Sequence, residues 1–281
     1  MNFRKYHGLG NDYFVIHPSS FDLERDSNRI QRICDRHCGA GSDGILLGPL
    51  ESDKAEFGLR IFNPDGSEAQ KSGNGLRIFA RSLFDDGLVQ EDVPFSVDTL
   101  GGLVQCTILD AGKQVKVDMG SVTFKNTALP ATGPEREMIN ETLEVGDTTL
   151  TICGVSVGNP HCVVLKDTAP EKSEADSLGP LIENHSSFPE RTNVQFMHAV
   201  DKHTIQIEIW ERGAGYTLAS GSSSTASAAA AVKLGLCESP VTVLMPGGSL
   251  DIEFPDAESA IMTGPVQAIC HGQILPEAFD A

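Results

Sequence analysis

The chain has few basic residues. Its 281 residues include 21 lysines and arginines against 39 aspartates and glutamates, which gives a formal net charge of −18 at pH 7. A net charge of this sign repels phosphate backbones and anionic membrane surfaces. We therefore expect no nucleic-acid partner and no membrane partner.

Long apolar segments are also missing. No run approaches the roughly 18 apolar residues that a membrane-spanning helix needs. The segment from Met1 to His7 is followed by alternating polar and apolar residues, not by the apolar stretch and small-residue cleavage site of a secretory signal. The sequence therefore predicts neither a membrane span nor a signal peptide.

Paired cysteine spacings are absent as well. The seven cysteines form an odd set: Cys34, Cys38, Cys106, Cys153, Cys162, Cys237 and Cys270. Reduced thiols in a cytoplasm explain this set better than a disulfide framework. The spacing of Cys34 and Cys38 could suggest a metal, but no second ligand pair follows, so we expect no metal site.

What the chain does contain is an internal repeat. Apolar residues make up 40% of the sequence, enough for a core, and four short motifs recur at a constant offset of 148 residues. They are Gly10-Asn11 with Gly158-Asn159, Ile61 to Asn63 with Ile209 to Glu211, Ser72-Gly73 with Ser220-Gly221, and Gly87-Leu88 with Gly235-Leu236. One register shared by separated motifs predicts two homologous halves, residues 1–118 plus 267–281 and residues 119–266.

Each half has the same coarse pattern of strands and one helix. Residues 57–62 and 204–210 alternate as half-buried strands do. A helix is expected over 76–83, ending at Gly87, and another over 225–234, ending at Gly235. The second helix is small and apolar on every side, which is typical of a buried helix. We therefore expect an α/β (α+β) fold of two pseudo-symmetric halves, each a sheet or barrel wrapped around a central helix.

The two predicted helix starts are candidates for one binding site. Residues 72–75 and 220–223 each stand where a strand leads into a central helix, and the free N–H groups and positive end of a helix can hold an anion such as a carboxylate. Serine is also a favoured N-cap, so either segment alone could be simple capping. Because the motif occurs in both halves, we expect Ser72 and Ser220 to form a matched pair across a single small-molecule site.

Polar residues in otherwise apolar surroundings accompany these helix starts. Buried amides and charges need partners, and a polar ligand can supply them. Any single asparagine could instead belong to a turn, and Glu211 with Arg212 could be a solvated ion pair. The candidates are Asn11, Asn63, Asn159, His161, Asn193, Glu211 and Arg212.

The combined motifs resemble the diaminopimelate epimerase family over residues 1 to about 270. The segments that carry the resemblance are His7 to Asp12, Phe62 to Glu68, Ser72 to Gly75, Gly158 to His161, and Glu211 to Gly215 leading to Ser220-Gly221. The resemblance implies an isomerase in lysine and peptidoglycan precursor biosynthesis. Such an enzyme interconverts LL- and meso-diaminopimelate by two-base proton transfer at Cα and needs no cofactor. We also consider a homodimer.

The resemblance also implies roles for individual residues. The catalytic positions would be Ser72 and Ser220, with His161 and Glu211 as the pair that tunes the acid–base groups. Gly73-Asn74 and Gly221-Ser222 would hold the reacting α-carboxylate. The remaining substrate contacts would be Asn11, Asn63, Asn159, Asn193, Glu211 and Arg212. Gly44 stands where some relatives use a substrate-contacting glutamine.

Both positions that are cysteine in the family are serine here. A thiol with a pKa near 8.5 can be lowered into a base at neutral pH, whereas a serine hydroxyl needs a strong neighbouring base. Two alternatives therefore stay open: a family member that binds diaminopimelate with impaired turnover, and one that acts on another amino acid. Cys→Ser is also a change that one would engineer, but Lys71 and Ser222 to Ser224 differ from the family as well, which favours natural divergence.

Overall fold

The computed structural model describes residues 1–20 and 27–279. The chain forms two compact units, residues 1–118 with 263–281 and residues 119–262. It enters the second unit along β8 (Gln114–Ser121) and leaves it along β17 (Ser259–Pro265). The second unit is therefore continuous in sequence, whereas the first is interrupted.

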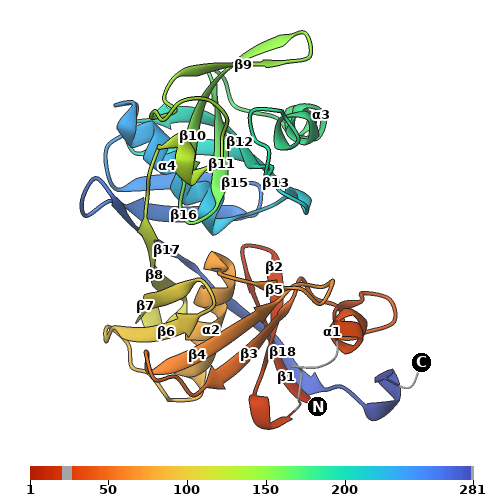
Figure 1. The fold of residues 1–281 in the computed structure, drawn as a ribbon. Helices are drawn as coiled ribbons and strands as arrows, with labels where there is room; N and C mark the ends of the chain where they lie inside the picture. Colours follow the sequence, from red (N-terminus) through yellow and green to blue (C-terminus); the bar gives the residue numbers. More distant parts are fainter. Residues whose placement is uncertain (21–26, 280–281) are drawn as a thin grey trace. The chain divides into compact units, whose positions relative to one another are not determined.

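The first unit contains a mixed sheet with helices α1 and α2 (Figure 1). Neighbouring strands follow the order β18, β1, β2, β3, β4, β6, β7, β8, with β5 added beside β4. The β2–β3 and β4–β6 pairs are parallel and the other pairs are antiparallel. The bounds are β1 Asn2–Gly8, β2 Asn11–Ile16, η1 Pro18–Ser20, α1 Ser27–Cys34, β3 Ile45–Leu50, β4 Phe57–Phe62, β5 Glu68–Ala69, α2 Gly73–Asp85, β6 Phe95–Thr99, β7 Gly102–Leu109, η3 Asp110–Gly112, β18 Gln267–Gln273 and η5 Pro276–Phe279.

The second unit contains a mixed sheet with helices α3 and α4. Neighbouring strands follow the order β9, β10, β11, β12, β13, β15, β16, with β14 added beside β13. The β11–β12 and β13–β15 pairs are parallel and the others are antiparallel. The bounds are η4 Asn126–Ala128, β9 Glu141–Val145, β10 Thr148–Ser156, β11 Pro160–Lys166, α3 Lys172–Glu183, β12 Asn193–Asp201, β13 Thr204–Glu211, β14 Gly215–Thr217, α4 Gly221–Lys233, β15 Val241–Met245 and β16 Gly248–Glu253.

The two units repeat one topology. The run β1 to β7 of the first unit pairs in the same order and with the same directions as the run β10 to β16 of the second. The register agrees as well, since Phe62 of β4 pairs with Ile45 and Trp210 of β13 pairs with Val194. The predicted α+β fold of two pseudo-symmetric halves is confirmed.

Each unit has its own apolar core. In the first unit, Phe14, Ile45 and Phe62 pack with the inner face of α1. In the second, Ile152, Val164 and Phe196 pack with α3 and Phe188. The strands expected at 57–62 and 204–210 are β4 and β13. Phe62 of β4 belongs to the first core, and Trp210 of β13 packs against the second.

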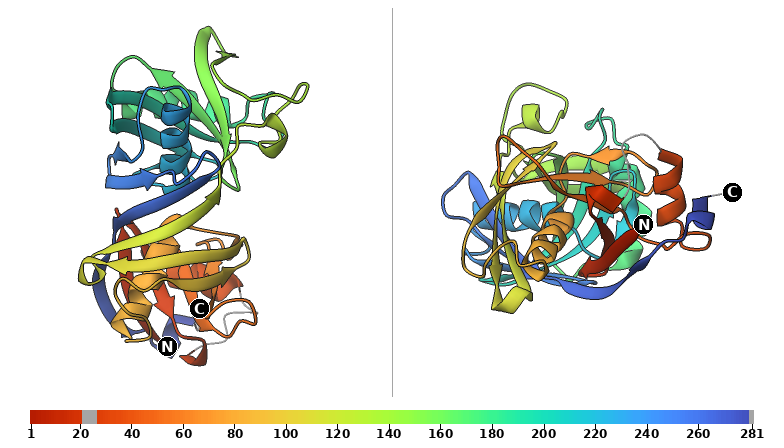
Figure 2. Two further views of the ribbon diagram at one scale, coloured as in Figure 1. Left: turned by 90° about the vertical axis from the view of Figure 1, so that its left-hand side faces the viewer. Right: turned by 90° about the horizontal axis from the view of Figure 1, so that it is seen from below.

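The helices α2 and α4 each lie against the strands of their own unit (Figures 1 and 2). Strands β1, β2, β3 and β7 contact α2, and α4 contacts strands from β10 to β16. The run from Thr225 to Ala231 in α4 is buried, so its small side chains allow the surrounding strands to approach closely. This is the buried central helix that the sequence predicted.

Both central helices end in the same way. Gly87 after α2 and Gly235 after α4 each have φ of 70°, and the next residue, Leu88 or Leu236, donates its N–H back to the carbonyl of Leu83 or Ala231. These are Schellman motifs, which need a left-handed residue at the glycine. The predicted helix ends are therefore correct.

The start of the second central helix agrees with the prediction. We expected the helix to begin within residues 220–223 and to contain the small apolar run from residue 225, and α4 begins at Gly221 with Ser220 as its N-cap. No helix within residues 1–20 and 27–279 has both the length and the apolar character that crossing a membrane requires.

Candidate active site

Ser72 is the N-cap of α2. Its backbone is extended, with φ −141° and ψ 118°, and its Oγ accepts a hydrogen bond from the N–H of Gly75 at 3.0 Å. A Cβ at Gly75 would lie 3.2 Å from that oxygen, so glycine keeps this first turn open. Gly73 and Asn74 are the first two residues of the helix, as expected for an anion-binding helix start.

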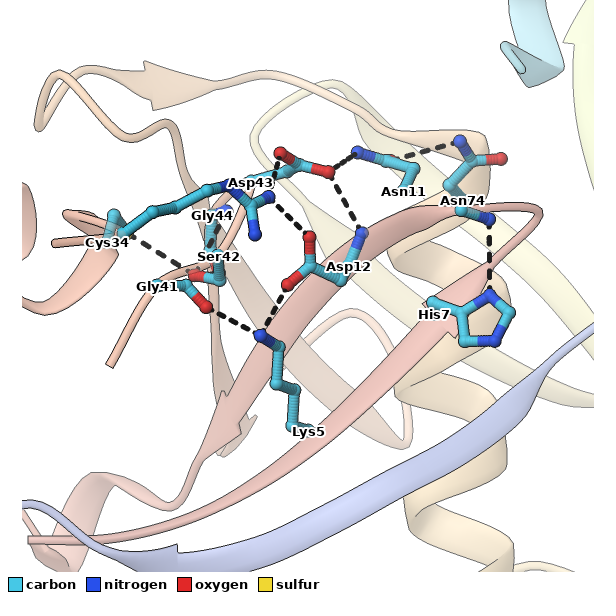
Figure 3. A network of polar contacts seen from close by, with 12 residues as sticks. Lys5, His7, Asn11, Asp12, Cys34, Gly41, Ser42, Asp43, Gly44 and Asn74 are labelled. Carbon is cyan, nitrogen blue, oxygen red and sulfur yellow. Dashed lines mark hydrogen bonds and ion pairs between the residues drawn. The ribbon is translucent and has the colours of Figure 1, made fainter. Parts of the chain in front are cut away.

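A chain of directed hydrogen bonds holds two of the predicted asparagines (Figure 3). Arg77 donates to Asn74 Oδ1 at 2.9 Å, Asn74 Nδ2 donates to Asn11 Oδ1 at 3.0 Å, and Asn11 Nδ2 donates to Asp43 Oδ2 at 3.0 Å. Arginine can only donate and a carboxylate can only accept, so both amide orientations are fixed. The buried guanidinium of Arg77 has its pKa lowered to about 9 by desolvation.

A cluster of charges lies beside this chain, in the loop after α1 and at the start of β2. Lys5 bonds to Asp12 Oδ2 at 2.7 Å, and Arg36 bridges Asp12 and Asp43 at 2.6 Å each. Burial raises the pKa of Asp12, but the hydrogen bonds from Arg36 and Lys5 outweigh it and leave the pKa below its ordinary value. Asp43 also accepts the N–H of Asp12 at 3.0 Å, so the network fixes the backbone beside Asn11.

Asn63 follows β4 and belongs to a tight turn. Its Nδ2 donates to Ser67 Oγ at 2.9 Å, and its N–H and carbonyl bond to Ser67 and Gly66. The sequence left open whether this asparagine belongs to a turn, and the structure shows that it does. Its half-exposed side chain keeps further hydrogen-bonding capacity.

Ser220 repeats the role of Ser72 in the second unit. It caps α4, and its Oγ accepts the N–H of Ser223 at 3.4 Å and lies 3.5 Å from Ser222 Oγ. Glu211, the last residue of β13, has its pKa raised by burial, while a hydrogen bond with Ser220 opposes this shift. An ionisable carboxyl therefore contacts the hydroxyl of Ser220.

His161 is fully buried on β11. Its Nε2 bonds to Asn159 Oδ1 at 2.9 Å, and desolvation lowers its pKa to about 3. An imidazole with this pKa is neutral at pH 7 and is a weak base. The side chain of Gln195 on β12 raises the pKa of His161 slightly and donates to Ser223 Oγ at 2.9 Å, which links β12 to the first turn of α4.

Asn193 and Arg212 meet at the edge where β12 begins. Asn193 Nδ2 donates to the carbonyl of Pro160 at 2.9 Å, and its Oδ1 accepts the N–H of Arg212 at 3.0 Å. The guanidinium of Arg212 donates to the carbonyl of Glu190 at 3.1 Å. Glu211 and Arg212 do not form the ion pair that the sequence left open, since each has a different partner.

The structure changes one expectation about these residues. We expected the polar groups to lack protein partners, but Asn11, Asn63, Asn159 and Asn193 each have at least one. Those partners hold the side chains in place and leave part of each amide for a ligand. No sequence motif pointed to Asp43 and Gln195, because their contacts join segments far apart in the chain. Arg77 was missed as well, although its partner Asn74 lies one turn away in α2.

Comparison with known proteins agrees with this arrangement. The family model for diaminopimelate epimerase matches residues 3–125 and 153–269. A Nostoc protein named diaminopimelate epimerase 2 is 54% identical over 99% of this chain and 97% of its own length. The diaminopimelate epimerase of Heliobacterium modesticaldum is 39% identical over 98% of this chain and 99% of its own length.

Solved structures share the fold at low identity. A probable proline racemase from Agrobacterium radiobacter has a TM-score of 0.70 at 16% identity and covers 99% of this chain and 94% of that one. A PhzF-family phenazine biosynthesis protein from Bacillus anthracis has a TM-score of 0.66 at 16% identity, with 98% and 99% covered. These likenesses support the fold alone. The family model and the sequence relatives also identify the family. The chain belongs to the diaminopimelate epimerase family.

Proposed function

We propose that this protein is a cofactor-independent amino-acid epimerase that interconverts LL- and meso-diaminopimelate by proton transfer at Cα, within lysine and peptidoglycan precursor biosynthesis. One observation carries the proposal: the family model matches both repeated units, in the segments that include the capped starts of α2 and α4. The relatives that carry this name match nearly the whole chain.

We propose the following roles for the residues of each unit. Ser72 and Ser220 take the two positions for proton transfer, with Glu211 bonded to Ser220 and His161 in the same unit. The first N–H groups of α2 and α4, at Gly73-Asn74 and Gly221-Ser222, bind the α-carboxylate. The other substrate contacts are Asn11, Asn63, Asn159, Asn193, Glu211 and Arg212.

A second candidate is a family member that binds diaminopimelate, or another amino acid, with little turnover. Two observations favour it. The hydroxyls of Ser72 and Ser220 both serve as N-caps, and His161 is a weak base. A hydroxyl is a poor base without an activating partner. The two candidates differ in whether the Cα hydrogen exchanges.

The deciding experiment is hydrogen exchange in heavy water. LL-diaminopimelate and the protein are incubated in D2O, and deuterium at Cα is measured by mass spectrometry, beside a Ser72→Cys, Ser220→Cys double variant. Exchange by the unaltered protein supports the epimerase. Exchange by the double variant alone supports the binding protein, and a thermal shift with each amino acid of a panel then identifies its ligand.

If neither protein exchanges deuterium and no amino acid shifts the thermal midpoint, both candidates are wrong. We also propose that the protein works in the cytoplasm, which its seven free cysteines support. A homodimer remains our proposal for the assembly. Analytical ultracentrifugation at micromolar concentration tests it, and a single species with the 30.0 kDa mass of one chain would contradict it.

A further inference from the structure

A side chain that can hold a proton lies close to the hydroxyl of Ser72. The Oγ of Ser72 accepts from the Gly75 N–H at 3.0 Å, so the hydroxyl proton points elsewhere. The Oη of Tyr13 lies 3.5 Å from the same oxygen. A phenol has an ordinary pKa near 10, far below that of an aliphatic hydroxyl, so it is the stronger acid of the two and its anion is the form that accumulates.

The fold holds the ring of Tyr13 in this place. Tyr13 lies in β2 and is only 7% exposed. A Cβ at Gly44 would lie 2.6 Å from Cε1 of the ring and 2.5 Å from the carbonyl oxygen of Phe62, closer than atoms can approach. Only glycine at position 44 therefore leaves room for the ring of Tyr13 in its present position.

We propose that Tyr13 accepts a proton through Ser72. The Tyr13 phenolate takes the hydroxyl proton of Ser72 while the Ser72 oxygen takes the Cα proton of the amino acid. The C–H bond breaks, its electron pair stays on Cα, an O–H bond forms on Ser72, and the proton released by Ser72 forms the O–H bond of Tyr13. The return of both protons along the same route reverses the step.

Two features of the site suit this step. The Gly75 N–H and the positive end of α2 stabilise the negative charge that develops on the Ser72 oxygen. The 3.5 Å separation is longer than the 2.7–2.8 Å of a good O–H···O bond, and a movement of about 0.7 Å closes it. Hydrogen bonds of this kind are often long without substrate and tighten when substrate binds.

The proposal rests on the proposed function, and its test uses the same heavy-water exchange, now measured against pH. The phenolate form of a tyrosine grows as the pH rises. Exchange by the unaltered protein should therefore rise with pH. Tyr13→Phe should lower the rate at least about tenfold and abolish this rise.

A matched control removes another buried phenol from the same unit. Tyr6 donates to Asp85 Oδ2 at 2.9 Å and not to Ser72, so Tyr6→Phe should keep the rate and the pH profile. Thermal midpoints confirm that each variant is folded.

The background Ser72→Cys separates this role from a structural one. A thiol is its own base, so Tyr13→Phe should change exchange less than twofold in that background. The proposal is overturned if Tyr13→Phe costs the same in both backgrounds, if the pH profile survives it, or if the unaltered protein does not exchange while the Ser72→Cys, Ser220→Cys variant does. Failure of both proteins to exchange would overturn the proposed epimerase as well.

Discussion

Ser72 and Ser220 have the same backbone conformation and the same capping role, yet their hydrogen bonds differ in length. Ser72 Oγ accepts the N–H of Gly75 at 3.0 Å, and Ser220 Oγ accepts that of Ser223 at 3.4 Å. The shorter bond lies within the usual range for N–H···O and the longer one does not. The two serines therefore differ in how strongly they hold their helices.

Replacing each serine with alanine measures this difference. Ser72→Ala should lower the free energy of unfolding by about 1 kcal/mol, the usual cost of a lost N-cap, and Ser220→Ala should cost less. Urea unfolding followed by circular dichroism gives both values. Ser72→Thr keeps a capping hydroxyl and is the control. An equal cost at the two sites would contradict the prediction.

His161 makes the stability of the fold sensitive to acid. Burial lowers its pKa to about 3 from the ordinary value near 6.5, so between these values the unfolded chain binds a proton that the folded chain does not. Stability is unaffected by this residue above about pH 6.5 and is lost as the pH falls toward 3. For each pH unit below about 6.5, the equilibrium constant for unfolding increases by at most about tenfold.

His161→Gln should therefore flatten the dependence of stability on pH between about 6.5 and 3. Urea midpoints measured every half pH unit test this, with the exposed His37→Gln as the matched control. If the control flattens the curve as much as His161→Gln does, the buried imidazole is not the cause. The remaining slope would come from carboxylates such as Asp12, whose lowered pKa acts at lower pH.

Among the elements, the central helices show how the sequence encodes a helix end. Gly87 and Gly235 have φ of 70°, and a Cβ would meet no atom within 4 Å at either position. An alanine at either position would destabilise the fold only through its left-handed backbone conformation, which costs roughly 1–2 kcal/mol. Gly87→Ala and Gly235→Ala should each lower the free energy of unfolding by that amount.

Asparagine tolerates the left-handed conformation better than alanine does, so Gly87→Asn and Gly235→Asn should cost less. Chemical denaturation of the four variants gives the comparison. Equal losses for alanine and asparagine would mean that steric crowding, not backbone conformation, sets the cost.

The elements that sequence predicted best are those with strong local signals. Alternation located β4 and β13, and glycine located the ends of α2 and α4. Ser220 located the start of α4, because serine is a favoured N-cap. Ser224 and Thr225 then donate to carbonyls of their own helix, at 2.8 and 2.9 Å.

The site was predicted less completely, for a physical reason. Asn11 and Asn193 could be singled out from motifs, but their partners come from distant segments. Asn193 bonds to Pro160, 33 residues away, and Asn74 to Asn11, 63 residues away. Such pairs depend on how the sheet folds, so the contact of Asp43 with Asn11 could not be recognised before the structure.

For the molecule as a whole, the formal net charge of −18 is the dominant electrostatic feature. Like charges repel in the compact state, and salt shortens the range of this repulsion from about 30 Å at 0.01 M to about 3 Å at 1 M. We expect the thermal midpoint to rise by several degrees as NaCl increases over this range, because the repulsion outweighs the exposed ion pairs, which salt weakens.

Scanning calorimetry at increasing NaCl concentrations tests this expectation. Glu51→Gln with Asp53→Asn removes two exposed carboxylates and should reduce the dependence on salt. A midpoint that falls with NaCl would show that favourable exposed ion pairs, such as the one between Lys202 and Glu238, dominate instead.

The interruption of the first unit has a consequence for synthesis. Strand β1 pairs with β18, and the amino group of Met1 donates to the carbonyl of Ile274, 273 residues later. A ribosome releases the whole second unit before β18 emerges, and domains generally fold as units during translation. The nascent chain should therefore complete its second unit before β18 is available, so β1 can pair with β2 early but gains its second neighbouring strand only afterwards.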